Sequence, residues 1–205
     1  MDATALLRPG LLDGCVVALG GGESCDALAM SLTSLGARTT SLPATLDEDA
    51  MTAAVDVTTQ VLLHDLRPAF AGGGTDALRA ALDLAWVTVR AVANAAFIPG
   101  GGAGPASGGH VAASGTRSGG KVTLVAPAPD PAGDPAVAGV RAAAENLART
   151  LSIEWARHGV TTVAITPAAD TDDAQLAAIA AFLASPAGDY WSGCRLALGE
   201  LALTA

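Results

Sequence analysis

The stretch DPAVAGVRAAAENLARTLSIEWARHGVTTVAITP, residues 134–167, decides the fold. It predicts a long helix followed by a buried strand. Asp134 is placed to cap the helix, and Pro135 takes the first helical position, where its missing N–H costs nothing. Gly159 is expected to end the helix. The run VTTVAIT that follows is β-branched and typical of a strand.

One face of this helix is apolar, because apolar residues recur at three- and four-residue steps. They are Val137, Val140, Ala144, Leu147 and Leu151. A second long helix is predicted over residues 76–97, capped by Thr75, and it has a similar apolar side. Strands alternate with helices along the chain, which predicts an α/β fold. We expect a Rossmann-like, doubly wound, mostly parallel sheet in a three-layer α/β/α sandwich, with a single domain over residues 1–205.

The chain opens with CVVALGGGESCDALAMSLTSLGARTTSL, residues 15–42, which predicts a strand, a helix and a second strand. Ser24 can cap the helix and Gly36 can end it. The turn GGGES has two interpretations, a phosphate loop or a tight strand-to-helix turn. The tight turn is favoured, because Glu23 and Asp26 place carboxylates where phosphates would bind a helix N-terminus.

Composition narrows the function classes. The length of 205 residues suits one domain with a substantial core. The net charge is −9 and the 11 basic residues are scattered, which argues against nucleic acid and anionic membrane surfaces as partners. No apolar run approaches the ~20 residues of a membrane span, and residues 1–10 do not resemble a secretion signal.

Cysteines and histidines predict no metal site. The three cysteines have no Cys-x-x-Cys spacing, which favours reduced structural thiols in a cytoplasmic protein over a disulfide or a metal role. The three histidines are isolated from one another and from the cysteines. These residues are Cys15, Cys25, Cys194, His64, His110 and His158.

The run ENLARTLSIEWARHGVTTVAITP, residues 145–167, resembles the long helix and following strand of the short-chain dehydrogenase/reductase family. The resemblance extends over about residues 11–200 and is closest at 75–97 and 136–199. It implies the fold predicted above. Ordinary members of this family are NAD(P)-dependent oxidoreductases, and the resemblance by itself implies the same activity.

The catalytic residues of the family are missing from this chain. The family carries a Tyr and a Lys four residues apart on the long helix, but this chain has one tyrosine, Tyr190, and one lysine, Lys121. Tyr190 belongs to the structural pattern near the last strand, and we expect it to be a packing residue. The family's Asn, Ser, Tyr and Lys positions are held by Ala81, Pro127, Val137 and Arg141, in that order. The resemblance therefore predicts no catalytic residue.

The family's cofactor motif is also altered. Its pattern is Thr-Gly-x-x-x-Gly-x-Gly, and the four defined positions fall at Leu19, Gly20, Ser24 and Asp26. A dinucleotide site has an acid or an arginine after the second strand to bind the ribose or its phosphate. Here the residues are Leu42, Pro43 and Ala44. We therefore expect no cofactor-binding residues and no bound NAD(P).

Four further segments depart from the family. Residues 46–59 look like a compressed third strand and helix. The family motif Asn-Asn-Ala-Gly falls at residues 64–67, where a turn or surface role for His64 and Asp65 is favoured over catalysis, because neighbours in a strand point to opposite faces. Residues 99–120 predict a flexible glycine-rich surface loop rather than an anion cradle. The substrate lid after residue 167 is shortened.

Three functions remain open. The favoured one is a catalytically inactive homologue, a pseudoenzyme, that acts as a structural or regulatory subunit of a homo- or hetero-oligomer. Its partner would be a second copy or an active homologue, held through helices 76–97 and 136–158. The alternative is an NAD(P)-dependent oxidoreductase, or a lyase or isomerase, that uses Asp65, Arg141 or His64. The third is a small-ligand binding module with a cleft at the strand ends.

Overall fold

The computed structural model describes residues 7–22, 26–98, 119–130 and 132–199. Its centre is a six-stranded sheet in the order β2-β1-β3-β4-β5-β6, and every neighbouring pair is parallel. The strands are β1 (Val16–Gly20), β2 (Arg38–Ser41), β3 (Val61–Asp65), β4 (Gly120–Val125), β5 (Val160–Thr166) and β6 (Cys194–Ala197). The predicted parallel α/β sheet is therefore confirmed.

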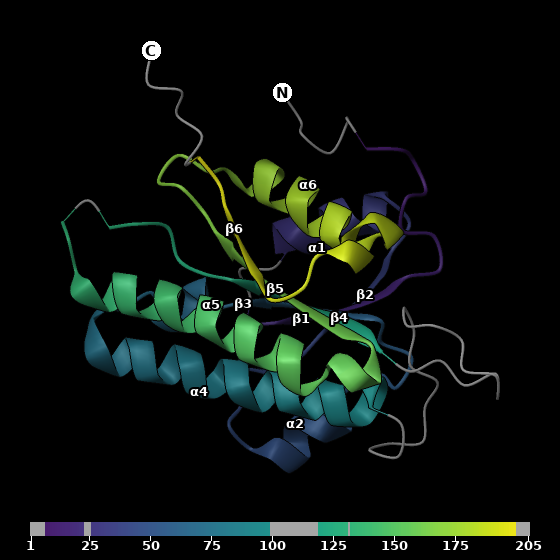
Figure 1. Cartoon of the computed structure of the whole chain (residues 1–205), viewed down its shortest axis with the longest axis horizontal. Coiled ribbons are helices and arrows are strands. Elements are labelled where there is room, and N and C mark those ends of the chain that lie inside the picture. The colour runs from purple at the N-terminus through teal and green to yellow at the C-terminus, as the bar shows by residue number, and fades with distance from the viewer. Residues whose placement is uncertain (1–6, 23–25, 99–118, 131, 200–205) are drawn as a thin grey trace.

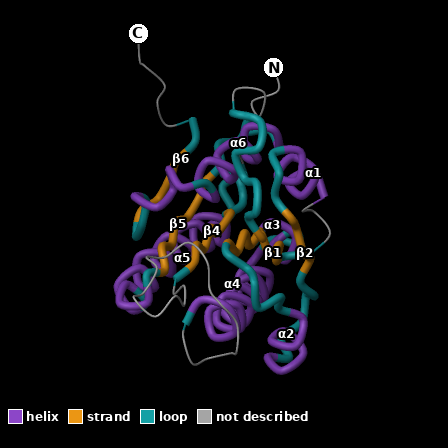
Figure 2. The backbone as a smooth tube through the Cα atoms, turned by 90° about the vertical axis from the view of Figure 1, so that its right-hand side faces the viewer, coloured by secondary structure: helices purple, strands orange, loops and turns teal. Residues whose placement is uncertain are grey.

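Helices cover both faces of the sheet (Figures 1 and 2). One face carries α1 (Asp26–Ser34) and α6 (Asp173–Ala184), whose apolar side chains form one core with the strands. The other face carries α2 (Glu48–Ala54), α4 (Gly74–Val92) and α5 (Pro135–Glu154), which form the second core. This is the three-layer arrangement that the alternation of strands and helices predicts.

Short elements complete the chain. The helix α3 (Arg67–Phe70) follows β3, and a π-helical turn, η3 (Ala93–Phe97), continues α4. Two 3-10 turns, η4 (Ala156–His158) and η5 (Pro186–Tyr190), follow α5 and α6. Gly120 opens β4 beneath Phe97, where a Cβ would lie 2.3 Å from the phenyl ring, so only glycine fits this contact.

The start of α5 agrees with the sequence prediction, whereas the helix ends at Glu154, before the predicted end at Gly159. Asp134 caps α5 by accepting a hydrogen bond from the backbone N–H of Ala136, and Pro135 is the first helical residue. Gly159 has φ +70°, so it ends η4 in the left-handed conformation that glycine favours. These signals lie within two residues of the backbone that they control, which is why the sequence alone locates them.

The start of α4 differs from the prediction. Thr75 does not cap this helix, since Gly73 is the N-cap residue and supplies no side-chain hydrogen bond. Asp134 caps it instead, by accepting a hydrogen bond from the backbone N–H of Gly74 at 3.0 Å. The prediction was wrong because the capping carboxylate is distant in sequence.

Two other expectations concern connections. The segment expected to hold a compressed third strand and helix contains only α2, and residues 42–60, all of which the structure describes, form no strand. Residues 167–172 alone join β5 to α6, in agreement with a short connection after Pro167. The glycine-rich segment 99–120 lies outside the described residues, except for Gly119 and Gly120.

One helical segment among the described residues, Gly74–Phe97, is long and apolar enough to span a membrane by length and composition alone. Of its apolar window, 61% is buried inside the protein, which is typical of a core helix. This burial follows from the position of α4, which packs against the sheet and against α5.

The helices α4 and α5 pack closely and bury part of each other's surface. Gly139 allows a close approach of these helices, since a Cβ there would lie 2.7 Å from Cδ1 of Leu78. Ala93, just after α4, is fully buried, and Val87, Ala143 and Trp155 are half-buried. Trp86 and Ile153 remain exposed, by 43% and 73%.

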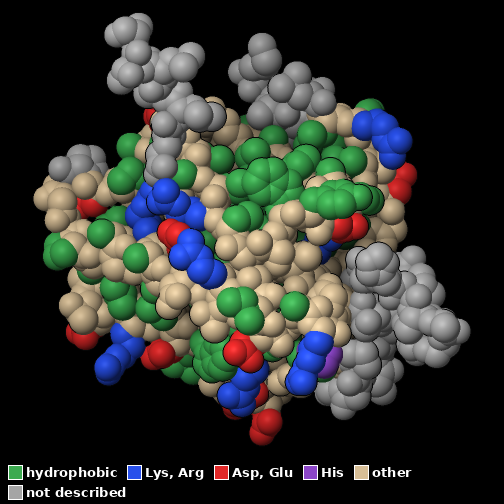
Figure 3. All heavy atoms as spheres, in the orientation of Figure 1, with side chains coloured by type: hydrophobic (Ala, Val, Ile, Leu, Met, Phe, Trp, Pro, Cys, Tyr) green, Lys and Arg blue, Asp and Glu red, His purple; other side chains and the backbone are tan. Residues whose placement is uncertain are grey.

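Tyr190 is not a packing residue, because 93% of its surface is exposed. It ends η5, and the neighbouring Trp191 packs edge-on against Phe182 of α6, with ring centroids 6.3 Å apart. Hydrophobic side chains gather over α6 in the space-filling view (Figure 3). Of these two aromatic residues, Trp191 packs against α6 and Tyr190 is exposed.

Candidate functional site

The candidate site lies at the carboxyl edge of the sheet. From β1 the chain passes to β2 on one side and later returns to β3 on the other, so the strand order reverses between β1 and β3. Ligands of open parallel sheets bind in the crevice at such a switch point. The residues that follow the carboxyl ends of β1, β3, β4 and β5 therefore determine what this site can do.

The glycine turn after β1 packs tightly against the end of β3. Gly21 has φ +109°, and a Cβ there would lie 2.0 Å from the carbonyl oxygen of Asp65. Gly22 has φ +102°, a conformation that side chains rarely adopt. This geometry agrees with the tight-turn interpretation of GGGES. Glu23 and Ser24 lie outside the described residues, and α1 begins at Asp26.

His64 and Asp65 are both fully buried, so the predicted turn or surface role is wrong. They do point to opposite faces, but helices cover both faces of the central strand β3. The ring of His64 packs over Gly20 and beside Thr88, and neither ring nitrogen has a hydrogen-bond partner among the described residues. Burial lowers the pKa of His64 to about 4, so the ring is neutral near pH 7.

Asp65 is paired with Arg67 at the start of α3. The Nε of Arg67 donates to both carboxylate oxygens at 3.0 Å, and its Nη2 donates to Oδ2 at 2.8 Å. The backbone N–H of Arg67 also donates to Oδ1 of Asp65. A bidentate pair of this kind holds the guanidinium in one orientation.

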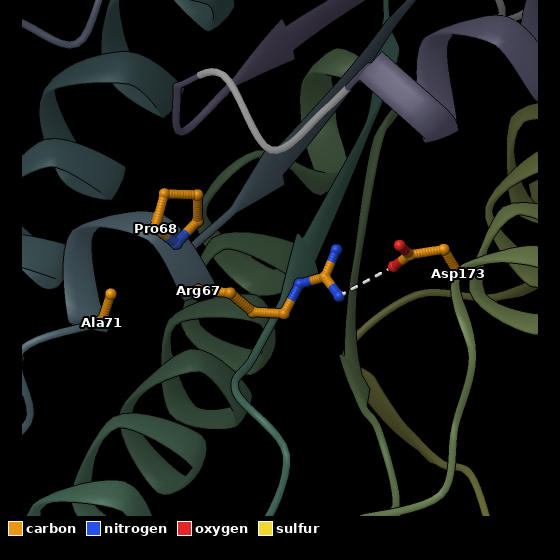
Figure 4. Close-up of a pocket in the computed structure, with 4 residues that line it drawn as sticks. All are labelled: Arg67, Pro68, Ala71 and Asp173. Carbon is orange, nitrogen blue, oxygen red and sulfur yellow. Dashed lines mark hydrogen bonds and ion pairs between the residues drawn. The ribbon is translucent and has the colours of Figure 1, made fainter.

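Arg67 also reaches across the crevice. Its Nη1 donates to Oδ1 of Asp173, in the first turn of α6, at 3.1 Å (Figure 4). These two residues, with Pro68 and Ala71, line an open pocket of about 400 Å³. The network connects the end of β3 to the start of α6. Sequence reasoning missed it, although Asp65 and Arg67 two residues apart at the end of a buried strand were a usable signal.

Arg141 holds together the loops after β4 and β5. Its Nη1 donates to the carbonyl oxygen of Pro127 at 2.6 Å and to that of Pro167 at 2.9 Å. Val137, one turn earlier in α5, is 8% exposed, and Ala81 is fully buried in the core behind it. These positions, with Pro127, are the four at which the family has its catalytic residues. The one charged side chain among them is that of Arg141, and it binds main-chain carbonyls.

The lysine and the tyrosine of the chain lie elsewhere. Lys121 stands near the start of β4, at the opposite edge of the sheet, and is 7% exposed. Its ammonium group donates to the carbonyl oxygens of Ala184 and Ser185 and pairs with Asp189. It therefore closes the carboxyl end of α6 and takes no part in the crevice.

Metal and thiol chemistry find little support in the described part of the chain, which holds no cluster of three or more His, Cys, Asp or Glu side chains. Burial raises the pKa of Cys15 to about 11, and burial also raises the pKa of Cys194. Both are free thiols. A raised pKa leaves little thiolate near pH 7, so these thiols are poor nucleophiles and poor metal ligands. Cys25 and His110 lie outside the described residues.

No protein-family model and no curated protein sequence matches the chain. Its structure does match solved structures. A citronellol catabolism dehydrogenase of Pseudomonas aeruginosa superposes with a TM-score of 0.68 at 19% identity, over 94% of this chain and 96% of that one. A 3-oxoacyl-[acyl-carrier protein] reductase of Brucella melitensis gives 0.67 at 14% identity, over 95% and 93%.

A third match is a hydroxysteroid dehydrogenase of Escherichia coli, with a TM-score of 0.64, 17% identity, and coverage of 92% of this chain and 97% of that one. A short-chain dehydrogenase/reductase of Serratia marcescens, solved as a double mutant, gives 0.64 at 18% identity, over 91% and 96%. The fold that the resemblance implies is thereby confirmed along nearly the whole chain. The chain has the Rossmann-like fold of the short-chain dehydrogenases/reductases.

Proposed function

We propose that this chain is a pseudoenzyme with the short-chain dehydrogenase/reductase fold, which acts as a structural or regulatory subunit of a homo- or hetero-oligomer. The observation that carries this proposal is the position of Arg141. It takes the place of the family's lysine, and its guanidinium binds the carbonyl oxygens of Pro127 and Pro167. A group engaged in this way acts as a structural cross-link between two loops.

The surrounding positions support the same proposal. Proton transfer to a carbonyl substrate needs an acid within hydrogen-bond reach. Val137 stands where the family has its tyrosine, and Pro127 stands where it has its serine, so neither offers a hydroxyl group. Ala81 replaces the family's asparagine and is buried in the core.

The described residues after β2 lack a group that would bind the ribose of NAD(P). The residues after β2 are Leu42, Pro43 and Ala44, which cannot bind a ribose hydroxyl or a 2′-phosphate through their side chains. The residues present therefore do not fit the dinucleotide, and we propose no cofactor.

The rival is an oxidoreductase, lyase or isomerase with unusual catalytic residues. The solved proteins of similar fold are named dehydrogenases and reductases. However, His64 and Asp65 are fully buried, and the carboxylate of Asp65 is bound by Arg67. Neither side chain can reach a substrate without a rearrangement of β3, so this alternative has less support.

The assembly surface in this proposal is the α4–α5 layer. Trp86 and Ile153 are exposed there, and Ala138 and Ala142 are exposed small residues on α5 that would let another helix approach closely. An obligate interface of this type buries on the order of 2,000 Å². The partner is a second copy or an active homologue, in the cytoplasm, where thiols such as Cys15 stay reduced.

Titration with NADH and NADPH tests the inactive-crevice part of this proposal. Cofactor fluorescence is followed as protein is added, and an active 3-oxoacyl-[acyl-carrier protein] reductase serves as the positive control. We expect no saturable change at micromolar cofactor with this chain. Binding with a micromolar dissociation constant would contradict the proposal.

A further inference from the structure

An open pocket lies between α3 and the start of α6. It measures about 400 Å³ and is lined by Arg67, Pro68, Ala71 and Asp173. It lies at the carboxyl edge of a parallel sheet, where ligands of this class of fold bind. Its volume falls at the low end of the range for small-molecule pockets, ~300 to 1,000 Å³.

Arg67 is presented to this pocket in a fixed orientation. Asp65, which is fully buried, holds the Nε and Nη2 side of the guanidinium from behind. The bonds to Asp65 and Asp173 use three of the five N–H donors, so donors remain on the Nη1 and Nη2 end. An arginine supported in this way is preorganised for a planar or tetrahedral oxyanion.

Asp173 is a replaceable partner for Arg67. It makes a single contact at 3.1 Å, and its side chain is 59% exposed, whereas Asp65 makes a bidentate pair and is buried. Exposed ion pairs contribute little to stability, so Asp173 can turn into solvent at small cost. A ligand oxyanion that took its place would keep a negative charge beside Arg67, and the N-terminus of α6 would still face a negative group.

We propose that this pocket binds the oxyanion group of a small molecule, a carboxylate or a phosphate, and that the ligand displaces Asp173 from Arg67. Asp173 thus acts as an internal competitor that occupies Arg67 when no ligand is bound. Pro68 and Ala71 provide an apolar wall for a short hydrocarbon segment next to the oxyanion. This site concerns binding alone and does not depend on whether the chain is a pseudoenzyme.

The test follows the Nε–Hε signal of Arg67 by NMR while inorganic phosphate or acetate is added at constant ionic strength, with chloride as the reference salt. We expect saturable shifts with at least one oxyanion and none with chloride. The tighter of the two anions identifies the source of the oxyanion as a phosphate or a carboxylate. Absence of saturable shifts with both anions would overturn the proposal.

Asp173→Asn provides the sharper test, because it removes the competitor and leaves Arg67 in place. We expect affinity to rise by up to about fivefold, the equivalent of the ~1 kcal/mol of an exposed ion pair. Glu48→Gln is the matched control, since Glu48 is also an exposed carboxylate paired with an arginine, Arg90. Equal affinities for the two variants would contradict the proposal.

A third variant addresses the location of the site. Substitution of Arg67 leaves Asp65 buried without a partner and can unfold the chain. Ala71→Phe avoids this problem, because Ala71 is an exposed pocket residue and the Asp65–Arg67 pair remains intact. We expect the larger side chain to fill the pocket and abolish binding. Unchanged binding in a folded Ala71→Phe protein would overturn the assignment.

Discussion

Asp134 accepts a hydrogen bond from the backbone N–H of Gly74, with 3.0 Å between Oδ2 and the nitrogen. Its other oxygen, Oδ1, accepts from the backbone N–H of Ala136 at 2.8 Å. One carboxylate therefore caps α4 and α5 together, although their first residues are far apart in the sequence. This contact fixes the relative position of the two helices that form one face of the protein.

Asp134→Ala should remove two helix caps at once. One cap contributes ~1 kcal/mol, so we expect the free energy of unfolding to fall by roughly 2 kcal/mol. Urea unfolding followed by circular dichroism measures this loss. Asp47→Ala is the matched control, since Asp47 caps α2 alone. A loss no larger than that of Asp47→Ala would contradict the double-cap interpretation.

His64 should make the stability of the protein depend on pH. Its pKa is about 4 in the folded state and ~6.5 when unfolded, so the unfolded chain binds more protons between these values. Stability is therefore complete above pH 6.5 and is lost as the pH falls toward 4. The two pKa values correspond to a loss of roughly 3 kcal/mol.

His64→Leu should remove this part of the pH dependence, and it should stabilise the protein at pH 7, because two buried nitrogens without partners are removed. Urea unfolding at pH 7, 6 and 5 measures both effects. His158→Gln is the control, since His158 is half-buried at the end of η4. An unchanged pH dependence in His64→Leu would show that His64 does not carry the effect.

The double variant Val137→Tyr and Arg141→Lys should not gain carbonyl reductase activity. A tyrosine at position 137, which is 8% exposed, has little room. The residues after β2 also stay Leu42, Pro43 and Ala44, none of which is the acid or arginine that binds the ribose or its phosphate in a dinucleotide site. NADPH oxidation with a panel of ketones is the measurement, and a rate above the enzyme-free blank would contradict the prediction.

The parts of the fold that were predictable depend on short-range signals. Asp134, Pro135 and Gly159 act on backbone next to them, and apolar spacing fixed which face of α5 is buried. The cap on α4 was not predictable in the same way, because its carboxylate comes from another helix. The absence of a strand from residues 42–60 also needed the structure, in which α2 (Glu48–Ala54) is the one helix or strand of this described segment.

For the candidate site, the sequence predicted only which residues stand at the family's catalytic positions. The identities at Ala81, Pro127, Val137 and Arg141 are read from the sequence once the family pattern is aligned. The burial of His64 and Asp65 was not, because the alternation of side chains in a strand does not reveal whether both faces are covered. The Arg67–Asp173 contact joins residues from separate elements, so it is visible only in the structure.

The assembly surface has its own specific test. Trp86→Glu with Ile153→Glu places two charges on the exposed apolar residues of the α4–α5 layer, so an oligomer held by this layer should dissociate. Met30→Glu with Leu46→Glu is the matched control, since these apolar residues are 69% and 58% exposed in other parts of the chain. We expect the control to keep the mass of the unmodified protein.

Sedimentation velocity of the unmodified protein at low micromolar concentration tests the subunit proposal most directly. We predict a species of at least twice the chain mass of 20.1 kDa, which falls to a monomer in the Trp86→Glu, Ile153→Glu variant. A single 20.1 kDa species that binds no dye for exposed hydrophobic surface would mean that the α4–α5 layer needs no partner, and it would contradict the proposal.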